Sequence, residues 1–324
     1  MKVLLIGANG FGRLHLDTLS RMDIDIEVFA RNIAALKEVS QDYDIGKIYS
    51  NITEALKSDA DVVDIVLPHN MHSVISTKAM NRKKHVLVEK PIAMDVLEGE
   101  RMIKESVKQG VKFMVAEQYY FDTSASWARE TVRSGKIGKL LSIIVRDQRF
   151  FTGGGWRVKK EEMGGGALID GGIHFVDTLL NFGGEYRDVK AYTSKGLSSI
   201  EESDTAMSLF AFRNGALGFL YYCWSYPHSP RVPGFEIVGS DGTIIEDVTT
   251  KPKADFRFMG GKRHAFGLPT LNGKKVELEI QDVFDAEIGQ FLKSVREDTP
   301  VPMDPALCLR DLKAVKDIYT SAEL

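Results

Sequence analysis

Val86-Leu87-Val88-Glu89-Lys90-Pro91 is a short apolar run that ends in an acid, a lysine and a proline. The β-branched run predicts a buried strand, and the proline, which lacks an N–H for the ladder, ends it. Lys90 therefore follows a central strand at its carboxyl end, where open α/β sheets bind ligands. A lysine there can lose its hydration and exchange a proton in a reaction, whereas at an ordinary strand end it reaches solvent.

A glycine turn near the amino terminus has the pattern of a nucleotide-binding turn. Val3–Ile6 predicts a buried strand, the turn is Gly7-Ala8-Asn9-Gly10-Phe11-Gly12, and a helical apolar pattern follows. In this context backbone N–H groups and a helix N-terminus can hold a pyrophosphate. Gly7 and Gly12 fit the first and third glycines of G-x-G-x-x-G, and Asn9 replaces the second with a residue that tolerates left-handed backbone. A turn of this kind can also exist for packing alone.

The residues after the second strand favour NADP over NAD. Ile26–Phe29 predicts that strand, and Ala30-Arg31-Asn32 follows it. A site that prefers NAD carries an acid here for the ribose 2′-hydroxyl, whereas the guanidinium of Arg31 matches a phosphate. The alternative is a solvated arginine at the start of the next helix.

Unusual residues follow five strands of the predicted sheet. A weak strand around Ile48 and strands at Asp61–Leu67 and Val111–Ala116 add to those above, and Asp95 with Glu98 predicts a helical capping box. In a right-handed doubly wound sheet the carboxyl ends of the strands lie at one edge, so the residues there would converge on one crevice. These residues are Gly7, Arg31, His69 with Asn70, Lys90, and Gln118 with Tyr119.

Beyond residue 121 the alternation of strands and helices gives way to long strands with tight turns. Thr205–Phe212 and Ala216–Trp224 flank Asn214-Gly215, and Asp241-Gly242 joins two further strands. Both dipeptides predict hairpins, so we expect an α+β domain built on a large, mostly antiparallel open sheet. Because antiparallel sheets often leave one face to cover, we also expect a homodimer or homotetramer through this sheet.

Two glycine-rich segments, residues 153–157 and 164–172, separate the two sets of strands. Asp170 and His174 are four residues apart, which on an α-helix would place them on one face. An apolar stripe would lie opposite, made by Ile169, Ile173, Val176 and Leu180. A single helical histidine is more often structural than catalytic. Here Asp170 and Asp177 could orient it, and histidine exchanges protons near neutral pH.

Composition argues against several classes of protein. The chain has 324 residues, enough for two domains, and its net charge of −3 gives no footprint for nucleic acid or an anionic membrane. Its two cysteines form no metal or disulfide motif, and the first apolar run breaks at Gly7, too early for a signal-peptide core. No segment reaches transmembrane length. We expect a cytoplasmic protein that needs no metal.

Over essentially its whole length the chain resembles the glucose–fructose oxidoreductase / inositol dehydrogenase (Gfo/Idh/MocA) family. The resemblance rests on Gly12-Arg13-Leu14-His15, Pro68 to His72, Glu89-Lys90-Pro91, Gly154-Gly155-Trp156-Arg157, and Gly164 through Asp170 to His174. It implies an NAD(P)-dependent oxidoreductase that acts on a hydroxyl of a sugar or cyclitol. It also implies that Lys90 and His174 lie beside the nicotinamide, and that the peptide bond before Pro91 is often cis.

The strand ends and the resemblance together give a candidate site. The expected catalytic residues are Lys90, which binds the reacting oxygen, His174, which takes the hydroxyl proton, and Asp170, which orients His174 or a neighbouring hydroxyl. The expected cofactor residues are Gly7, Asn9, Gly10, Phe11, Gly12, Arg31, Pro68, His69, Asn70, His72, Glu89, Lys90 and Gln118. The expected substrate residues are Lys90, Tyr119, Trp156, Arg157, Asp170 and His174.

The expected architecture is α/β, with a Rossmann domain over residues 1–121 and an α+β substrate-binding and oligomerisation domain over 122–324. The helix at 305–322 can pack back on the first domain. The expected reaction is hydride transfer between a nicotinamide, NADP before NAD, and a hydroxyl or carbonyl carbon of a sugar-like polyol. Two alternatives are a glycosidase that oxidises its substrate transiently with a held NAD, and a non-catalytic cofactor sensor. A sensor has no need of Lys90 and His174, which argues against it.

Overall fold

The computed structural model describes residues 1–30, 42–252 and 261–322. The chain folds into two compact units, each of which draws on two segments. The first unit comprises Met1–Glu117 and Phe284–Leu309, and the second comprises Gln118–Val283 and Arg310–Leu324. The expected boundary at residue 121 therefore lies at residue 117 in this division, and residues 284–309 group with the first unit.

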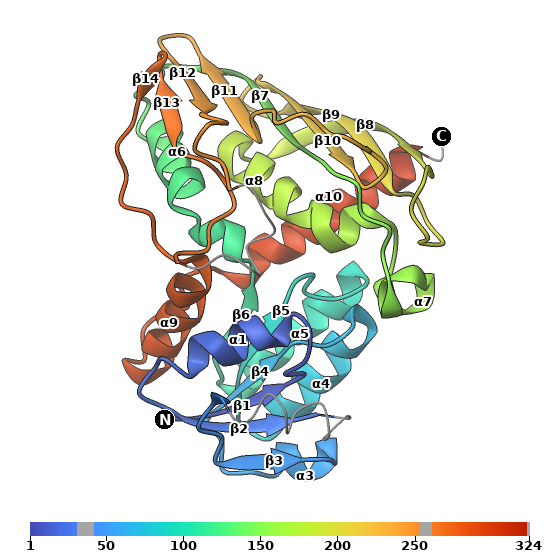
Figure 1. Cartoon of the computed structure of the whole chain (residues 1–324), viewed down its shortest axis with the longest axis vertical. Coiled ribbons are helices and arrows are strands. Elements are labelled where there is room, and N and C mark those ends of the chain that lie inside the picture. Colours follow the sequence, from blue (N-terminus) through green and yellow to red (C-terminus); the bar gives the residue numbers. More distant parts are fainter. Residues whose placement is uncertain (31–41, 253–260, 323–324) are drawn as a thin grey trace. The chain divides into compact units, whose positions relative to one another are not determined.

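The first unit contains a six-stranded parallel sheet with the strand order β3-β2-β1-β4-β5-β6 (Figure 1). This is the strand order of a doubly wound Rossmann sheet, the fold that the sequence predicts. Because the strands are buried on both faces, their sequences are nearly continuous apolar runs. The strands are β1 (Lys2–Ile6), β2 (Asp25–Phe29), β3 (Lys47–Tyr49), β4 (Val62–Ile65), β5 (His85–Glu89) and β6 (Phe113–Ala116).

The helices of the first unit begin and end where the local sequence indicates. The helix α5 (Val96–Gln109) has Asp95 as its N-cap, whose carboxylate accepts a hydrogen bond from the N–H of Glu98, and it ends at the left-handed Gly110. These are the favoured residues at the two ends of a helix. The others are α1 (Gly12–Leu19), α3 (Ile52–Leu56), α4 (His72–Met80) and the 3₁₀ turn η2 (His69–Met71).

The helix α9 (Val283–Arg296), distant in sequence, joins the first unit through Phe284. The ring of Phe284 lies 5.7 Å from that of Phe11 and 5.9 Å from that of His15. Arg21 adds an ion pair with Asp285 at the surface. These contacts explain why a segment assigned to the second domain from its position in the sequence belongs with the first unit.

The second unit contains an eight-stranded sheet with the strand order β14-β13-β12-β11-β7-β10-β9-β8 (Figure 1). Only β7 and β10 pair in parallel; the other neighbours are antiparallel, as expected. The Asn214-Gly215 turn joins β9 to β10, with Gly215 at a φ of +90° and Asn214 Oδ1 accepting from the N–H of Ala216. The strands are β7 (Leu140–Gln148), β8 (Tyr186–Ser194), β9 (Thr205–Phe212), β10 (Leu217–Cys223), β11 (Phe235–Gly239), β12 (Thr243–Glu246), β13 (Pro269–Leu271) and β14 (Lys274–Lys275).

Helices cover one face of this sheet (Figure 1). The helix α8 (Ile173–Gly183) lies against β7 and β10. Every residue of α8 is buried, so the expected single apolar stripe is wrong: this helix forms the centre of the unit and is covered on all sides. The remaining helical elements are η3 (Gln118–Phe121), α6 (Thr123–Arg133), η4 (Gly155–Val158), α7 (Lys160–Met163), η5 (Leu168–Gly172) and α10 (Pro305–Ala322).

The segment before α8 departs from α-helical geometry. Leu168–Gly172 forms a π-helical turn, in which hydrogen bonds close over five residues. The four-residue spacing between Asp170 and His174 therefore does not have the α-helical meaning that the sequence pattern suggests. Single π turns inside helices are frequent at functional sites.

Candidate active site

The turn after β1 is built from glycines that nothing larger could replace. A Cβ on Gly7, whose φ is +101°, would lie 2.0 Å from the carbonyl oxygen of Val66. A Cβ on Gly12 would lie 1.8 Å from the carbonyl oxygen of Gly7. Gly10, by contrast, has a φ of +59°, and a Cβ there would meet no described atom within 4 Å. Packing and backbone conformation thus fix the turn, and its tip stays open.

The start of α1 is suited to an anion. Among the described residues no side chain caps Phe11, and the first turn of the helix carries no acid. The first N–H groups of a helix have no partner within it and carry the positive end of its dipole. Asn9 and Gly10 at the tip of the turn are exposed. These residues fit the pyrophosphate of a dinucleotide.

At the end of β5, Lys90 is attached to a buried ionic network. His15, which is 0% exposed, has Nδ1 2.9 Å from Asp64 Oδ2 and Nε2 3.1 Å from Glu89 Oε1. The other oxygen of Glu89 accepts a hydrogen bond of 3.1 Å from the backbone N–H of Lys90. The next peptide bond, to Pro91, is cis, as the resemblance implies. Glu89, an expected cofactor residue, is 5% exposed and contacts both His15 and the N–H of Lys90.

His15 is a residue that the sequence argument did not place in the site. Burial by itself would lower its pKa, but the carboxylates of Asp64 and Glu89 raise the pKa of His15 well above its ordinary value. An imidazole between two carboxylates can donate from both nitrogens only as an imidazolium. The sequence signal for this role was the histidine that closes the Gly12-Arg13-Leu14-His15 motif.

The segment after β4 contains the other expected cofactor residues of the first unit. His72 is 0% exposed, with Nδ1 2.8 Å from the carbonyl oxygen of Pro91 and Nε2 2.9 Å from that of Leu67. It therefore links the segments that follow β4 and β5. His69 is buried, Pro68 is half-buried and Asn70 is exposed. Arg31, on which the NADP expectation depends, lies outside the described residues.

In the second unit, His174 belongs to an aromatic cluster. Its ring stacks on that of Tyr119, with the centroids 4.3 Å apart and the planes 15° apart. Tyr119 also packs edge-on against Phe175 at 5.5 Å and Phe266 at 5.6 Å. His174 remains 7% exposed. The stacking fixes the plane of the imidazole, which leaves its in-plane nitrogens directed away from Tyr119.

The glycine-rich segment brings a second group of expected residues together. Arg157 Nε donates a hydrogen bond of 2.6 Å to Asp170 Oδ2, and the guanidinium lies 4.4 Å from the centre of the Trp156 ring. Asp170 is 3% exposed, so the ion pair neutralises a buried carboxylate. Asp177, the other expected orienting residue for His174, accepts a hydrogen bond of 2.8 Å from Asn181 Nδ2.

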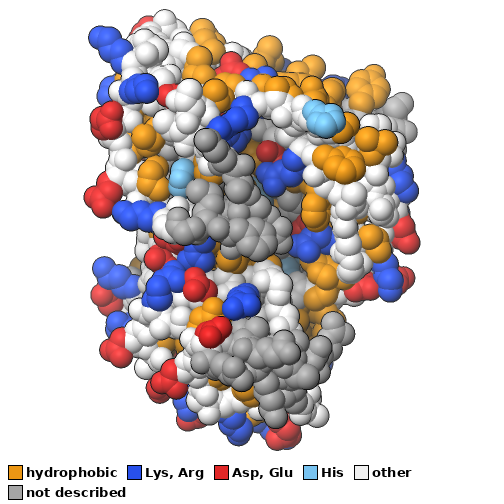
Figure 2. Space-filling view, in the orientation of Figure 1, with side chains coloured by type: hydrophobic (Ala, Val, Ile, Leu, Met, Phe, Trp, Pro, Cys, Tyr) orange, Lys and Arg blue, Asp and Glu red, His pale blue; other side chains and the backbone are white. Residues whose placement is uncertain are grey.

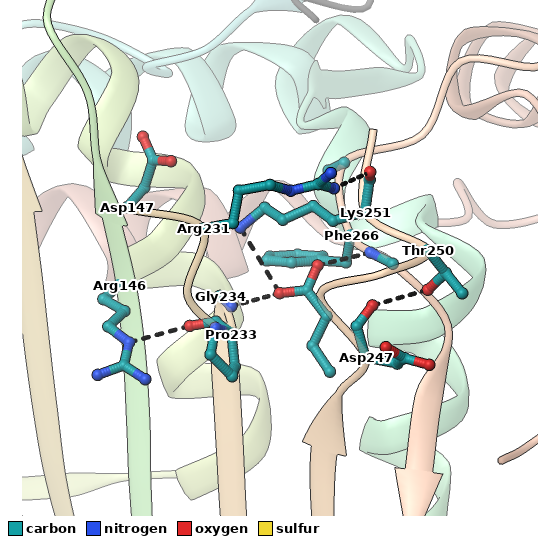
Figure 3. A network of polar contacts seen from close by, with 12 residues as sticks. Arg146, Asp147, Arg231, Pro233, Gly234, Asp247, Thr250, Lys251 and Phe266 are labelled. Carbon is teal, nitrogen blue, oxygen red and sulfur yellow. Dashed lines mark hydrogen bonds and ion pairs between the residues drawn. The ribbon is translucent and has the colours of Figure 1, made fainter. Parts of the chain in front are cut away.

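A polar network surrounds Phe266, one of the rings of the aromatic cluster (Figure 3). The buried carboxylate of Glu246 accepts hydrogen bonds from the N–H groups of Gly234 and Gly267, and Lys251 Nζ lies 3.6 Å from it. Asp122 Oδ2 accepts from the N–H groups of Ala265, at 2.8 Å, and Phe266. Asp122 and Glu246 thus both bind the backbone of the loop that carries Phe266. Phe266 in turn packs on Tyr119.

Gln118 carries a buried acceptor that the described residues leave unsatisfied. The residue is 1% exposed, and its Oε1 has no hydrogen-bond partner there. An unmade hydrogen bond of this kind costs about 1–3 kcal/mol, so native proteins supply a partner by some means. Hydroxyl and amide donors of a dinucleotide would suit this acceptor.

Among residues 1–30, 42–252 and 261–322, no three His, Cys, Asp or Glu side chains are grouped so that they could hold a metal ion. In the same part of the chain, every helix is too short or too polar to cross a membrane.

Family models match most of the chain. Residues 1–117 match the model described as "Oxidoreductase family, NAD-binding Rossmann fold", and residues 126–245 match "GFO/IDH/MocA C-terminal domain". Each match lies wholly within one of the two units.

Individual relatives match this chain over most of its length. The chain is 26% identical over 316 residues to a myo-inositol 2-dehydrogenase of Thermotoga maritima, covering 93% of this chain and 90% of that one. It is 26% identical over 251 residues to an NADP(+)-dependent scyllo-inositol 2-dehydrogenase of Bacillus subtilis, covering 75% and 74%. It shares its fold with a levoglucosan dehydrogenase solved with NADH and levoglucosan, at a TM-score of 0.83 and 22% identity over 100% and 97% of the two chains.

Proposed function

The chain belongs to the Gfo/Idh/MocA family of oxidoreductases, and from that premise we propose that it transfers a hydride between NAD(P) and a hydroxyl-bearing carbon of a sugar or sugar-like polyol. The observation that carries this proposal is the attachment of Lys90 to a rigid strand end. Glu89 bonds the N–H of Lys90 and is itself held by His15, so the lysine backbone is preorganised for a reaction. Relatives named as inositol and levoglucosan dehydrogenases support the substrate class.

Each catalytic group has a distinct task in this proposal. A bound nicotinamide supplies the hydride acceptor for oxidation and the hydride donor for reduction. His174 takes the hydroxyl proton during oxidation and returns it during reduction. Lys90 donates a hydrogen bond to the reacting oxygen and stabilises the negative charge that develops there. Asp170, paired with Arg157, orients a neighbouring hydroxyl of the substrate or the imidazole itself, and Trp156 and Tyr119 line the pocket.

We further propose a division of labour along the chain. Residues 1–121 hold the cofactor. The Gly7–Gly12 turn binds the pyrophosphate, and Gln118 and the segment Pro68–Asn70 bind the rest of the dinucleotide. Residues 122–324, apart from α9 in the first unit, hold the substrate together with Lys90 and Tyr119. The buried free thiols of Cys223 and Cys308 are consistent with a reducing, cytoplasmic location.

For the cofactor we propose NADP in preference to NAD. The residues after β2 are Ala30 and Arg31, without the acid that would bind a ribose 2′-hydroxyl. One relative is itself named as NADP(+)-dependent, which supports the same preference. A levoglucosan dehydrogenase of the same fold is solved in complex with NADH, so our preference for NADP depends on the local sequence after β2.

One experiment tests both reaction and cofactor. Absorbance of the reduced nicotinamide is followed across a panel of sugars and cyclitols, with NAD and NADP side by side. We expect turnover with at least one sugar-like polyol and a higher kcat/KM with NADP. Hydrolysis without net change in free cofactor would indicate the glycosidase, and binding of cofactor without turnover would indicate the sensor. A clear preference for NAD would contradict the Arg31 argument.

The outer face of the eight-stranded sheet supports a homo-oligomer. Tyr192 on β8, Leu209 on β9 and Leu217 on β10 are 84%, 60% and 62% exposed. Their strands are neighbours in the sheet, and Figure 2 shows hydrophobic side chains along the upper part of the view, where Figure 1 places these strands. Exposed apolar side chains on neighbouring strands are typical of an interface, and the exposed Lys190, which pairs with Leu209 in the register, is a charged residue among them. We propose that a second copy of the chain covers it.

Leu209→Lys is expected to shift the protein toward monomer, because it places a charge in the middle of that apolar face. Molar mass measured by light scattering across a dilution series gives the shift. Val107→Lys is the matched control, since Val107 is 77% exposed on α5 and lies outside the sheet. A wild-type protein that is already monomeric, or a variant with unchanged mass, would show that this face is not the interface.

A further inference from the structure

Glu287 is a buried acid whose carboxyl group makes no hydrogen bond to the described residues. The residue lies on α9 in the first unit and is 0% exposed. Neither of its carboxyl oxygens has a hydrogen-bond partner among the described residues. A buried ionised carboxylate without a partner is far more costly than a neutral carboxylic acid in the same place. The protonation state of Glu287 therefore needs an explanation.

The groups that face Glu287 come from four other elements and are mostly acidic. They are Asp64 on β4, Glu89 at the end of β5, Glu117 just after β6, and His15 on α1. His15 is the one base among them, and both of its ring nitrogens are already engaged by Asp64 and Glu89. A negative charge on Glu287 would meet further carboxylates and a cation that is already paired.

We propose that Glu287 is a neutral carboxylic acid in the folded protein, and that His15, Asp64, Glu89 and Glu287 form a positioning network for the backbone of Lys90. Phe284, one helical turn before Glu287, packs on His15 and so brings Glu287 to this place. Glu89 is the link, because one of its oxygens is held by His15 and the other holds the N–H of Lys90. A neutral Glu287 adds no negative charge beside Glu89, which makes both contacts. The catalytic meaning of the network rests on the proposed function of Lys90.

The electrostatics of the site agree with a neutral Glu287. Burial raises the pKa of Glu287 well above its usual range, Glu89 raises it further, and His15 opposes the shift. An acid with a raised pKa binds more protons in the folded than in the unfolded state, so folding stability falls as the pH rises between the two pKa values. The loss begins near the ordinary glutamate pKa of about 4.3 and continues up to the raised value.

Glu287→Gln tests the protonation state without any substrate. An amide has the shape of the neutral acid and cannot ionise. We expect the variant to gain stability over the wild type as the pH rises from 5 to 8, by up to about tenfold in the unfolding equilibrium constant per pH unit. Glu297→Gln is the control, since Glu297 is exposed and loses the same formal charge. A variant whose stability difference from the wild type does not change with pH would overturn the neutral acid.

The link to Lys90 is tested by hydrogen exchange and by the pH profile. Protection of the Lys90 amide, corrected for intrinsic exchange, should fall in the wild type at alkaline pH and persist in Glu287→Gln. With the true substrate, the alkaline limb of kcat should move to higher pH in the same variant. Equal protection of Lys90 in both proteins at alkaline pH would overturn the positioning network. A protein that shows the exchange difference yet oxidises no sugar would instead refute the proposed function and leave the network standing.

Discussion

His174→Asn is expected to lower kcat by about 10²–10⁴-fold, the usual contribution of a general acid–base group. Asparagine keeps a polar side chain beside Tyr119 but exchanges no proton near neutral pH. The affinity for the reduced cofactor should stay close to that of the wild type, because in our proposal the cofactor residues belong to the first part of the chain. Steady-state kinetics on the best substrate and a fluorescence titration with reduced nicotinamide separate the two effects.

His228→Asn provides the matched control for His174→Asn. His228 is exposed in the second unit and has a φ of +54°, a conformation that asparagine accepts readily. The control should retain wild-type turnover. If His174→Asn also retained it, His174 would not be the proton-exchanging group, and the proposed mechanism would be wrong.

Lys90→Met is expected to lower kcat by about 10²–10³-fold, the loss seen when one donor to a developing oxyanion is removed. Methionine keeps an unbranched chain and removes the charge and all three N–H donors. The Lys90 N–H that binds Glu89 belongs to the backbone, so the strand end should keep its structure. The KM for the cofactor should change little, and a rate loss shared by oxidation and reduction would identify a role in the transition state.

The corresponding control is Lys104→Met on α5, where the lysine side chain is 77% exposed. It should behave as the wild type in every assay. If Lys90→Met lost cofactor binding along with turnover, the lysine would serve as a cofactor anchor and not as a donor to the reacting oxygen. That outcome would leave the family assignment intact and change the mechanism.

Local sequence predicts the first unit well because its signals are short-range. The runs at Val3–Ile6 and Val86–Val88 are buried strands, Asp95 caps α5, and the glycines at 7 and 12 stand where a side chain would clash with backbone. Each of these features depends on steric and hydrogen-bonding rules that operate within a few residues. The same is true of the Asn214-Gly215 hairpin in the second unit.

The parts that sequence could not predict depend on contacts between distant segments. Nothing near Glu287 in the sequence indicates that α9 returns to His15 to bury an acid. The burial of α8 on every side follows from the sheet and helices around it, whereas its own apolar residues predict a single buried stripe. A pattern based on 3.6 residues per turn does not predict the π turn at Asp170, nor the hydrogen bond between Arg157 and Asp170.

The position of β7 has a consequence for how the protein is made. β7 is the first strand of its sheet to leave the ribosome, yet it lies inside the sheet between β11 and β10. Its partner strands Leu217–Cys223 and Phe235–Gly239 are synthesised much later. Until then, both edges of this nine-residue strand lack the partners for their backbone hydrogen bonds. Unpaired edges invite association with other chains, and long-range pairing slows folding. The nascent chain is therefore most vulnerable to aggregation, and most in need of a chaperone, between the synthesis of β7 and that of β11.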